Sequence, residues 1–211
     1  MGPERREWRR EWLADGAVHA LGLILGVTGA IAMLAVVVSS DRSQLLPIAV
    51  YIFGLLAMLA CSAAYNVWQS SRHREWLRRL DHAAIFVMIA GTYTPLTVRL
   101  PAPWATGLTA GVWTAALVGV AAKLWQPRRM ETLSVFLYLA LGWIGLIAAK
   151  PLLASLDLAT LVLILAGGVV YSAGVLFHLS RDGRYSRALW HGCVLVAACV
   201  HYAAIMTLLE A

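Results

Sequence analysis

Apolar runs close to twenty residues long recur seven times along this chain of 211 residues. A helix of about twenty residues is needed to cross the ~30 Å hydrocarbon core of a bilayer. Runs of this length favour helices, because the strands of a membrane barrel would be about ten residues long with alternating polarity. We therefore predict an all-α integral membrane protein with a bundle of seven transmembrane helices. The predicted helices span residues 18–38, 45–68, 82–98, 104–124, 132–149, 154–177 and 188–209.

The composition agrees with this class. The chain is 61% hydrophobic and 13% charged, whereas soluble domains average about 45–50% apolar and about 25% charged residues. Its net charge of +6 does not indicate nucleic acid as a partner, because no basic face with interleaved aromatic residues exists outside the apolar runs. The basic residues lie in the short connections, where membrane topology explains them.

The distribution of lysine and arginine predicts the orientation. Fourteen of them fall on one side of the predicted helices and three, Arg42, Arg99 and Lys150, on the other. The positive-inside rule then places the N-terminus inside and the C-terminus outside. We expect a cytoplasmic segment at 1–17, a transmembrane domain at 18–211 and a multi-pass location in the cell membrane. The charged N-terminus does not resemble a cleaved signal peptide.

Polar residues enter the apolar phase at the inner ends of several predicted helices. Ser62 and Asn66 are four apart near the end of the second helix, and Asp81 stands at the start of the third. Arg187 and His191 are four apart at the start of the seventh helix, and the first helix places Asp15 and His19 at the same depth. A carboxylate at the edge of a hydrocarbon layer is costly and suggests a partner. We expect Ser62, Asn66, Asp81, Arg187 and His191 to converge in the inner leaflet.

Four stretches resemble bacterial hemolysin III proteins, the prokaryotic branch of the progestin and adipoQ receptor family. They are RRLDHAAIFVMIAGTYTP (78–95), AKLWQPRRMETLSVFLYLALGW (122–143), YSAGVLF (171–177) and LWHGCVLVAACVHYAAI (189–205). The resemblance covers nearly the whole chain and includes His19 and Gly22. It implies seven helices with the N-terminus inside, and the inner membrane of a bacterium as the location.

The resemblance also implies a zinc site. The family pattern is Ser-x3-His on the second helix, Asp at the start of the third and His-x3-His at the start of the seventh. Three histidines hold the metal, and the aspartate acts through a water. Such a site keeps an open position at which zinc can lower the pKa of bound water to about 7. In characterised relatives it is linked to hydrolysis of lipid amides such as ceramide.

This chain departs from that pattern. Ser62, Asp81 and His191 match it, but Asn66 and Arg187 stand where the other two histidines belong. Asparagine is a poor zinc ligand, and arginine cannot lose its proton to become one. Zinc at the family positions is therefore doubtful. His19 is a candidate substitute ligand, with structural packing as its alternative role.

The substitutions suggest a metal-free core. The Arg187 guanidinium would supply positive charge in place of zinc and form an ion pair with Asp81, while Asn66 and Ser62 complete the network. In the alternative, Arg187 extends to the cytoplasmic interface as a topology residue and leaves Asp81 to other partners.

Three function classes follow. We expect a hemolysin III-like protein of membrane-lipid homeostasis or sensing, with a degenerate zinc site and a lipid-like ligand in an inner-leaflet cavity. The first alternative is a zinc-dependent lipid amide hydrolase, with Asp81 and Ser62 as catalytic residues and a remodelled ligand set. The second is a channel-forming or cytolytic protein. It is disfavoured because no continuous polar stripe runs along any predicted helix.

Overall fold

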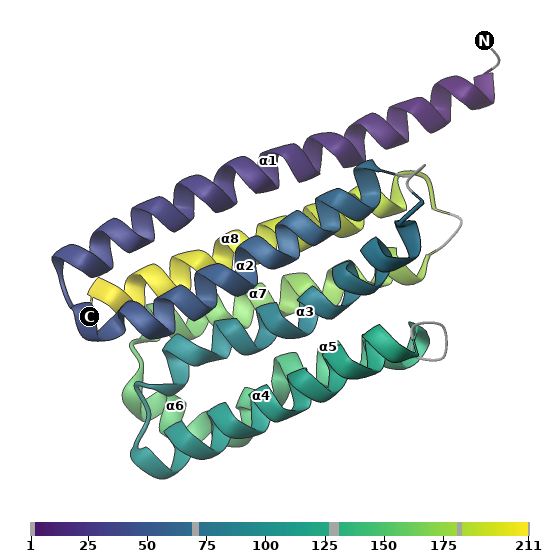
Figure 1. The fold of residues 1–211 in the computed structure, drawn as a ribbon. Coiled ribbons are helices and arrows are strands. Elements are labelled where there is room, and N and C mark those ends of the chain that lie inside the picture. The colour runs from purple at the N-terminus through teal and green to yellow at the C-terminus, as the bar shows by residue number, and fades with distance from the viewer. Residues whose placement is uncertain (1–2, 69–71, 127–130, 181–182, 211) are drawn as a thin grey trace.

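The chain folds into a bundle of long helices (Figure 1). The computed structural model describes residues 3–68, 72–126, 131–180 and 183–210, and no strand occurs in these ranges. The α-helices are α1 (Pro3–Ser39), α2 (Leu45–Val67), α3 (Arg74–Thr97), α4 (Ala102–Trp125), α5 (Glu131–Trp143), α6 (Ala149–Ser155), α7 (Leu158–Leu179) and α8 (Ser186–Glu210), with 3₁₀ turns η1 (Arg42–Gln44) and η2 (Ile144–Ala148). The all-α prediction is confirmed.

Within the described residues, six helical spans are long and apolar enough to cross a membrane. They comprise residues 7–39, 42–67, 102–125, 133–155, 158–179 and 186–210. The seventh predicted crossing, α3, is not among them, although it runs alongside α2 and α4 (Figure 1). Neighbouring helices cover α3, so its polar residues meet protein rather than lipid. With α3 included, the crossings are odd in number, and the two termini lie at opposite ends of the bundle (Figure 1).

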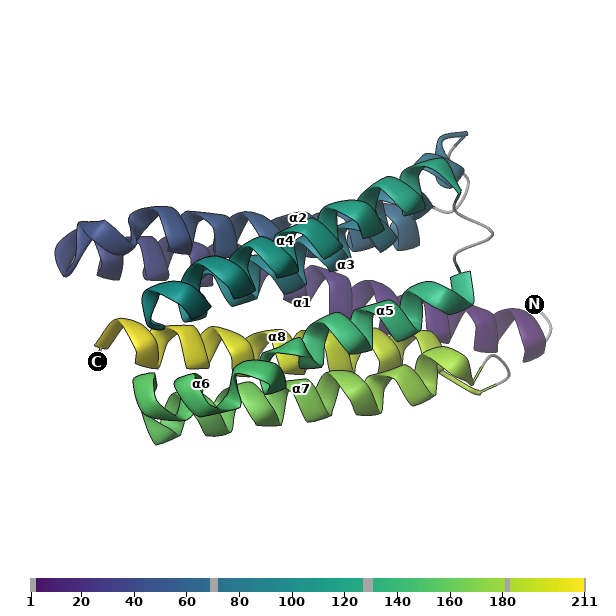
Figure 2. The ribbon, with the colours of Figure 1, turned by 90° about the horizontal axis from the view of Figure 1, so that it is seen from below.

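The helices form two connected groups. In one group α3 packs between α2 and α4, and in the other α7 packs against α8. α1 closes one side by contacting both α2 and α8 (Figure 2). α5 contacts α3, α4 and α7 more sparsely.

The first helix is longer than predicted. α1 starts at Pro3, so the segment expected at 1–17 continues directly into the first crossing from that residue onward. An ion pair between Glu7 and Arg184, and a hydrogen bond from the Tyr185 amide to Glu11 at 3.4 Å, tie this part of α1 to the start of α8. The charged stretch is therefore helical and docked on the bundle.

The boundary between the fifth and sixth crossings differs from the prediction. The fifth crossing continues through η2 and α6 to Ser155, and the sixth begins at Leu158 rather than near 154. Pro151 does not end the fifth crossing because it lies in the first turn of α6, where a missing N–H costs little. Asp157 marks the true start of α7, since its side chain accepts a hydrogen bond from the Thr160 amide at 2.9 Å. Side-chain and backbone hydrogen bonds from Thr160 hold the pKa of Asp157 below its ordinary value.

Glycines bring the backbones of α2 and α3 close together. A Cβ on Gly54 of α2 would lie 3.1 Å from the Val87 carbonyl oxygen, and one on Gly91 of α3 would lie 3.2 Å from the Val50 carbonyl oxygen. Here backbone faces backbone, so a side chain on either glycine would push α2 and α3 apart. This close pairing fixes the position of Asp81 relative to Ser62.

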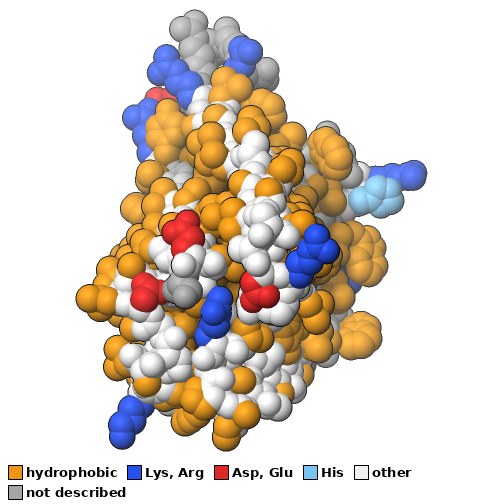
Figure 3. Space-filling model, turned by 90° about the vertical axis from the view of Figure 1, so that its left-hand side faces the viewer, with side chains coloured by type: hydrophobic (Ala, Val, Ile, Leu, Met, Phe, Trp, Pro, Cys, Tyr) orange, Lys and Arg blue, Asp and Glu red, His pale blue; other side chains and the backbone are white. Residues whose placement is uncertain are grey.

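The two ends of the bundle differ in charge. Figure 3 shows the end that carries the C-terminus, where a few charged side chains lie on the end face and hydrophobic side chains cover the flanks. The starts of α1, α3 and α8 and the end of α4, which together carry most of the described basic residues, lie at the other end (Figure 1). Arg128, Arg129 and Arg181, three of the fourteen residues counted on that side, lie outside the described residues. The orientation with this end inside stays a prediction.

Candidate functional site

A cavity of about 560 Å³ lies inside the bundle and is lined by residues of α1, α2, α3, α5, α7 and α8. Its volume is within the range of roughly 300–1,000 Å³ typical of small-molecule sites. Ser62, Asn66, Asp81, Arg187 and His191, the five residues expected to converge, all line it, and so does His19. The residues predicted to lie at one depth therefore line the same cavity.

Ser62, Asn66 and Asp81 form the wall contributed by α2 and α3. The Asn66 side-chain amide donates to the Ser62 carbonyl oxygen at 2.9 Å, and the Ser62 hydroxyl interacts with the Asp81 carboxylate. Asn66 and Asp81 are each only 8% exposed. Asp81 also lies within electrostatic reach of His191 and Lys123. The carboxylate is thus surrounded by polar and basic groups from α2, α4 and α8.

The expected ion pair between Arg187 and Asp81 is not formed. Both side chains are described, and no ion pair within 4.0 Å joins them. Arg187 is exposed in the first turn of α8, and its positive charge acts on Asp15 instead. The long aliphatic part of an arginine side chain lets its guanidinium reach the membrane interface. The Asp81 carboxylate interacts with Ser62 instead. The structure therefore matches the alternative in which Arg187 is an interfacial residue.

This geometry predicts additive effects for Asp81→Asn and Arg187→Gln. Because the two groups make no direct contact, the double variant should differ from the sum of the single variants by less than about 0.5 kcal/mol. Unfolding of the detergent-purified proteins would measure this coupling. A double variant much more stable than the sum predicts would instead restore the ion pair.

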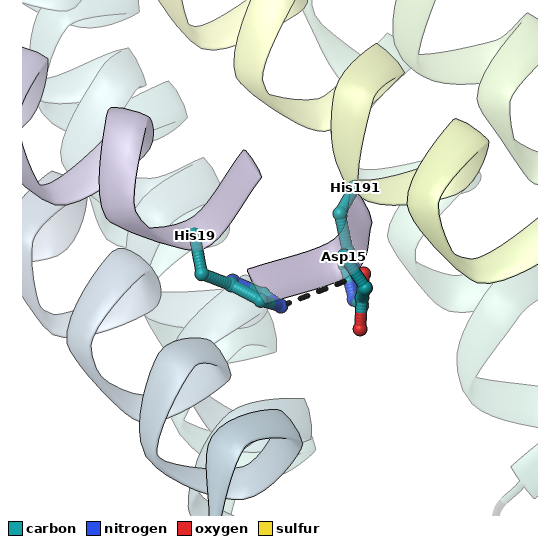
Figure 4. A group of neighbouring side chains, drawn as sticks. All are labelled: Asp15, His19 and His191. Atoms are coloured by element: carbon teal, nitrogen blue, oxygen red, sulfur yellow. Dashed lines mark hydrogen bonds and ion pairs between the residues drawn. The ribbon is translucent and has the colours of Figure 1, made fainter. Parts of the chain in front are cut away.

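Asp15, His19 and His191 form a compact cluster on the α1 and α8 side of the cavity (Figure 4). His191 Nδ1 lies 2.6 Å from Asp15 Oδ1, and His19 Nε2 lies 3.8 Å from the same oxygen. The two imidazole rings have centroids 4.5 Å apart. Since a carboxylate only accepts, His191 Nδ1 carries the proton of the short hydrogen bond. One potential ligand atom from each residue lies within 4.8 Å of the others.

The sequence did not predict a role for two residues that lie near the site. Asp15 was placed at the correct depth, and its spacing of four from His19 was the signal that both share one face of α1. Lys123 was counted only as a cytoplasmic basic residue, yet it is 1% exposed, and its Nζ lies 3.4 Å from His82 Nδ1. A lysine in the last turn of an apolar helix does not reveal by itself whether it turns inward.

Comparison with known proteins identifies the family. A family model described as "Haemolysin-III related" matches residues 6–202. The chain belongs to the haemolysin-III related family. It is 35% identical over 191 residues to "Hemolysin-3 homolog" of Bacillus subtilis (strain 168), with 88% of each chain covered. It is 31% identical over 193 residues to "Hemolysin-3" of Bacillus cereus, covering 88% of this chain and 86% of the relative.

A more distant relative supports the wider placement of this haemolysin-III related chain. The human "Monocyte to macrophage differentiation factor" is 27% identical over 203 residues, covering 92% of this chain and 83% of the relative. The family and the six apolar spans together indicate a multi-pass membrane protein.

The zinc site expected for the haemolysin-III related family does not fit the residues present. At the three expected ligand positions this chain offers one imidazole, His191, together with the Asn66 amide and the Arg187 guanidinium. The amide already donates to Ser62, and the guanidinium is a permanent cation. Those positions cannot supply a zinc ligand set and therefore support no zinc-dependent reaction.

Proposed function

We propose that this chain binds a membrane lipid in its interior cavity and acts in membrane-lipid homeostasis or sensing. The observation that carries the proposal is the uneven lining of the cavity. Ionisable and polar side chains gather at the end formed by the inner ends of α2, α3 and α8, where they can meet a headgroup. They include Ser62, Asn66, Asp81, Arg187 and His191.

The deeper part of the cavity suits an acyl chain. Most polar atoms there are satisfied by the protein itself. The Tyr93 hydroxyl donates to the Gly142 carbonyl oxygen at 2.7 Å, and Trp143 Nε1 donates to the Ser172 hydroxyl at 3.0 Å. The Tyr171 hydroxyl, which is buried without a partner, is an exception. With these groups paired, Met88, Ile89 and Leu139 and their apolar neighbours supply the remaining surface. Apolar walls with a few polar groups at one end are typical of a site for an amphipathic ligand.

Lipid occupancy can be tested by substituting two glycines that have open space beside them. A Cβ on Gly142, which lines the cavity, or on Gly111 of α4, which does not, would meet no atom within 4 Å. We expect Gly142→Leu to lower the amount of co-purified lipid several-fold, since the added side chain competes for the same space. Gly111→Leu is the matched control and should leave occupancy unchanged. Native mass spectrometry of the detergent-purified proteins measures the bound lipid, and equal occupancy in all three proteins would refute the proposal.

A second candidate is metal-dependent hydrolysis of a lipid amide such as ceramide. The Asp15, His19 and His191 cluster favours it, because two imidazoles and a carboxylate can hold a catalytic metal. Turnover of a fluorescent ceramide analogue by the zinc-loaded protein, lost in His191→Gln, would support this activity. The channel-forming alternative gains no support, because the acidic and basic side chains that line the cavity, Arg78, Asp81 and Arg187, lie at one end of it rather than along its length.

A further inference from the structure

The cluster of Asp15, His19 and His191 lies apart from the positions at which the family pattern places its ligands. It shares only His191 with that pattern and takes its other two residues from α1. His19 and His191 line the cavity, whereas Asp15 is 2% exposed and lies behind them. Figure 4 shows the three side chains directed toward one another across the α1–α8 contact. The cluster is therefore a built feature of the interface between α1 and α8.

One atom of the cluster lacks a partner. His19 Nε2 is buried and makes no hydrogen bond, and its whole residue is 7% exposed. Leaving a buried polar atom unpaired costs roughly 1–3 kcal/mol, so native structures rarely do so without a reason. This nitrogen is directed at Asp15 Oδ1 from 3.8 Å, a separation too long for a hydrogen bond. An unpaired buried nitrogen beside a carboxylate is an arrangement that a bound ligand could complete.

The donor set and spacing specify what that ligand is. Two imidazole nitrogens and one carboxylate oxygen are the ligands of many zinc sites with an open position. Bonds of ~2.0–2.2 Å in a tetrahedral site place ligand atoms about 3.3 Å apart. The cluster brackets this value, with a shortest separation of 2.6 Å and all three ligand atoms within 4.8 Å of one another. Binding an ion at this spacing requires the three side chains to shift and the proton of the His191–Asp15 hydrogen bond to be released, as metal binding to protonated ligands generally does.

The charges around the cluster also favour a cation. Asp15 lies within the cluster, and Asp81 is close enough to act electrostatically on both Asp15 and His191. The cationic Arg187 opposes these two carboxylates, but it is exposed and its charge is screened by solvent. The buried Lys123 offsets the charge of Asp81, but it is not among the charges that act on Asp15. Within the cluster, the Asp15 carboxylate is therefore opposed by the solvent-screened Arg187 and stays attractive to a cation.

We propose that Asp15, His19 and His191 bind one divalent transition metal ion, zinc in the first instance, at a site displaced from the family positions onto α1. The ion joins α1 to α8, and its open coordination position faces the cavity, because the two histidines line it. Replacement of the ligands at positions 66 and 187 is thereby offset by recruitment of Asp15 and His19. A metal site is retained, but with a carboxylate among its ligands.

Metal binding to the chelator-treated protein tests the proposal. We expect about one Zn²⁺ per chain, and a visible absorption band typical of four-coordinate Co²⁺ when cobalt replaces zinc. Asp15→Asn, His19→Gln and His191→Gln should each weaken binding by at least about 100-fold, because each removes a ligand. His178→Gln is the matched control, since His178 lines the same cavity but is not in the cluster, and it should leave binding unchanged.

A variant that carries the family's ligand set tests whether the metal site is displaced onto α1 or whether the family positions were assigned to the wrong residues. Asn66→His together with Arg187→His recreates the family ligand set, and this double variant should bind zinc even when Asp15→Asn is added. In the otherwise unchanged chain, Asp15→Asn alone should abolish the cobalt band. Zinc binding that survives Asp15→Asn in that chain, or the absence of any zinc binding, would overturn the proposal.

A measurement on the unsubstituted protein keeps the proposal testable if the variants fail to fold. Diethylpyrocarbonate modifies accessible imidazoles, and mass spectrometry reports each histidine separately. Zn²⁺ should protect His19 and His191 while His73, which does not line the cavity, reacts as before. Because His19 and His191 are largely buried, labelling is continued until both are modified in the zinc-free protein. Equal modification with Zn²⁺ present would then refute the site independently of any substitution.

Discussion

Asp15→Ala is expected to lower the free energy of unfolding of the metal-free protein by about 1–3 kcal/mol, the scale found when a buried group loses its hydrogen-bond partner. The Asp15 carboxylate is the acceptor of the 2.6 Å hydrogen bond from His191 Nδ1, and both side chains are nearly inaccessible, at 3% and 11% exposed. Removing the carboxylate leaves His191 with a buried donor and no partner. Removing His191 instead leaves a buried carboxylate facing only the 3.8 Å contact with His19.

A double-mutant cycle shows whether these losses come from the pair itself. Asp15→Ala together with His191→Ala leaves neither group unpaired, so the double variant should be more stable than the sum of the single losses by about 1–3 kcal/mol. The same cycle on Asp81 and Arg187 should give almost no coupling, which makes it the internal control. Denaturant titration in detergent with a chelator present measures all of these proteins. Additive losses for Asp15 and His191 would show that the short hydrogen bond contributes little.

Phe86→Ala should cost about 3–5 kcal/mol, the range for emptying a large buried site. Phe86 of α3 is 1% exposed, and its ring lies 4.6 Å from the Tyr138 ring, centroid to centroid. A Cβ on Gly119 of α4 would meet the same ring at 2.6 Å, so the ring rests directly on the α4 backbone. Truncating it opens a void at the junction of α3, α4 and α5.

Phe53→Ala is the matched control for this substitution. Phe53 lies on α2 and is 65% exposed on the outside of the bundle. Lipid tails replace its contacts after truncation, because there is little hydrophobic driving force between a helix surface and hydrocarbon. We expect a loss below about 1 kcal/mol, within the range for surface substitutions. Equal losses for Phe53→Ala and Phe86→Ala would contradict the packing of α3 between α4 and α5.

The helical architecture was predictable from the sequence because it follows from local requirements. In hydrocarbon every backbone amide and carbonyl group must be satisfied within the segment, so a long apolar run has few alternatives to a helix. The predicted boundaries failed where a local signal was misread. The predicted helices left residues 150–153 between them, whereas the capping side chain of Asp157 marks the real boundary.

The depth of each site residue was predictable for the same reason. Residues four apart share a helix face, and the alternation of crossings fixes which helix ends meet at one side of the membrane. That reasoning placed Asp15, His19, Asn66, Asp81, Arg187 and His191 at one level, and the structure brings all of them to the cavity or directly behind it. The roles of these residues in binding stay predictions.

The sequence by itself determined the helices, the likeness to the family and the departure from the expected ligand pattern at Asn66 and Arg187. Only the tertiary structure decided which side chains meet. Asp15 and His191 are 176 residues apart and touch because α1 packs against α8, while Arg187 at the same depth is exposed and leaves Asp81 to Ser62. Depth is set by each helix and the membrane, whereas partner choice depends on how the helices are rotated and packed against one another, and that depends on contacts spread over the whole bundle.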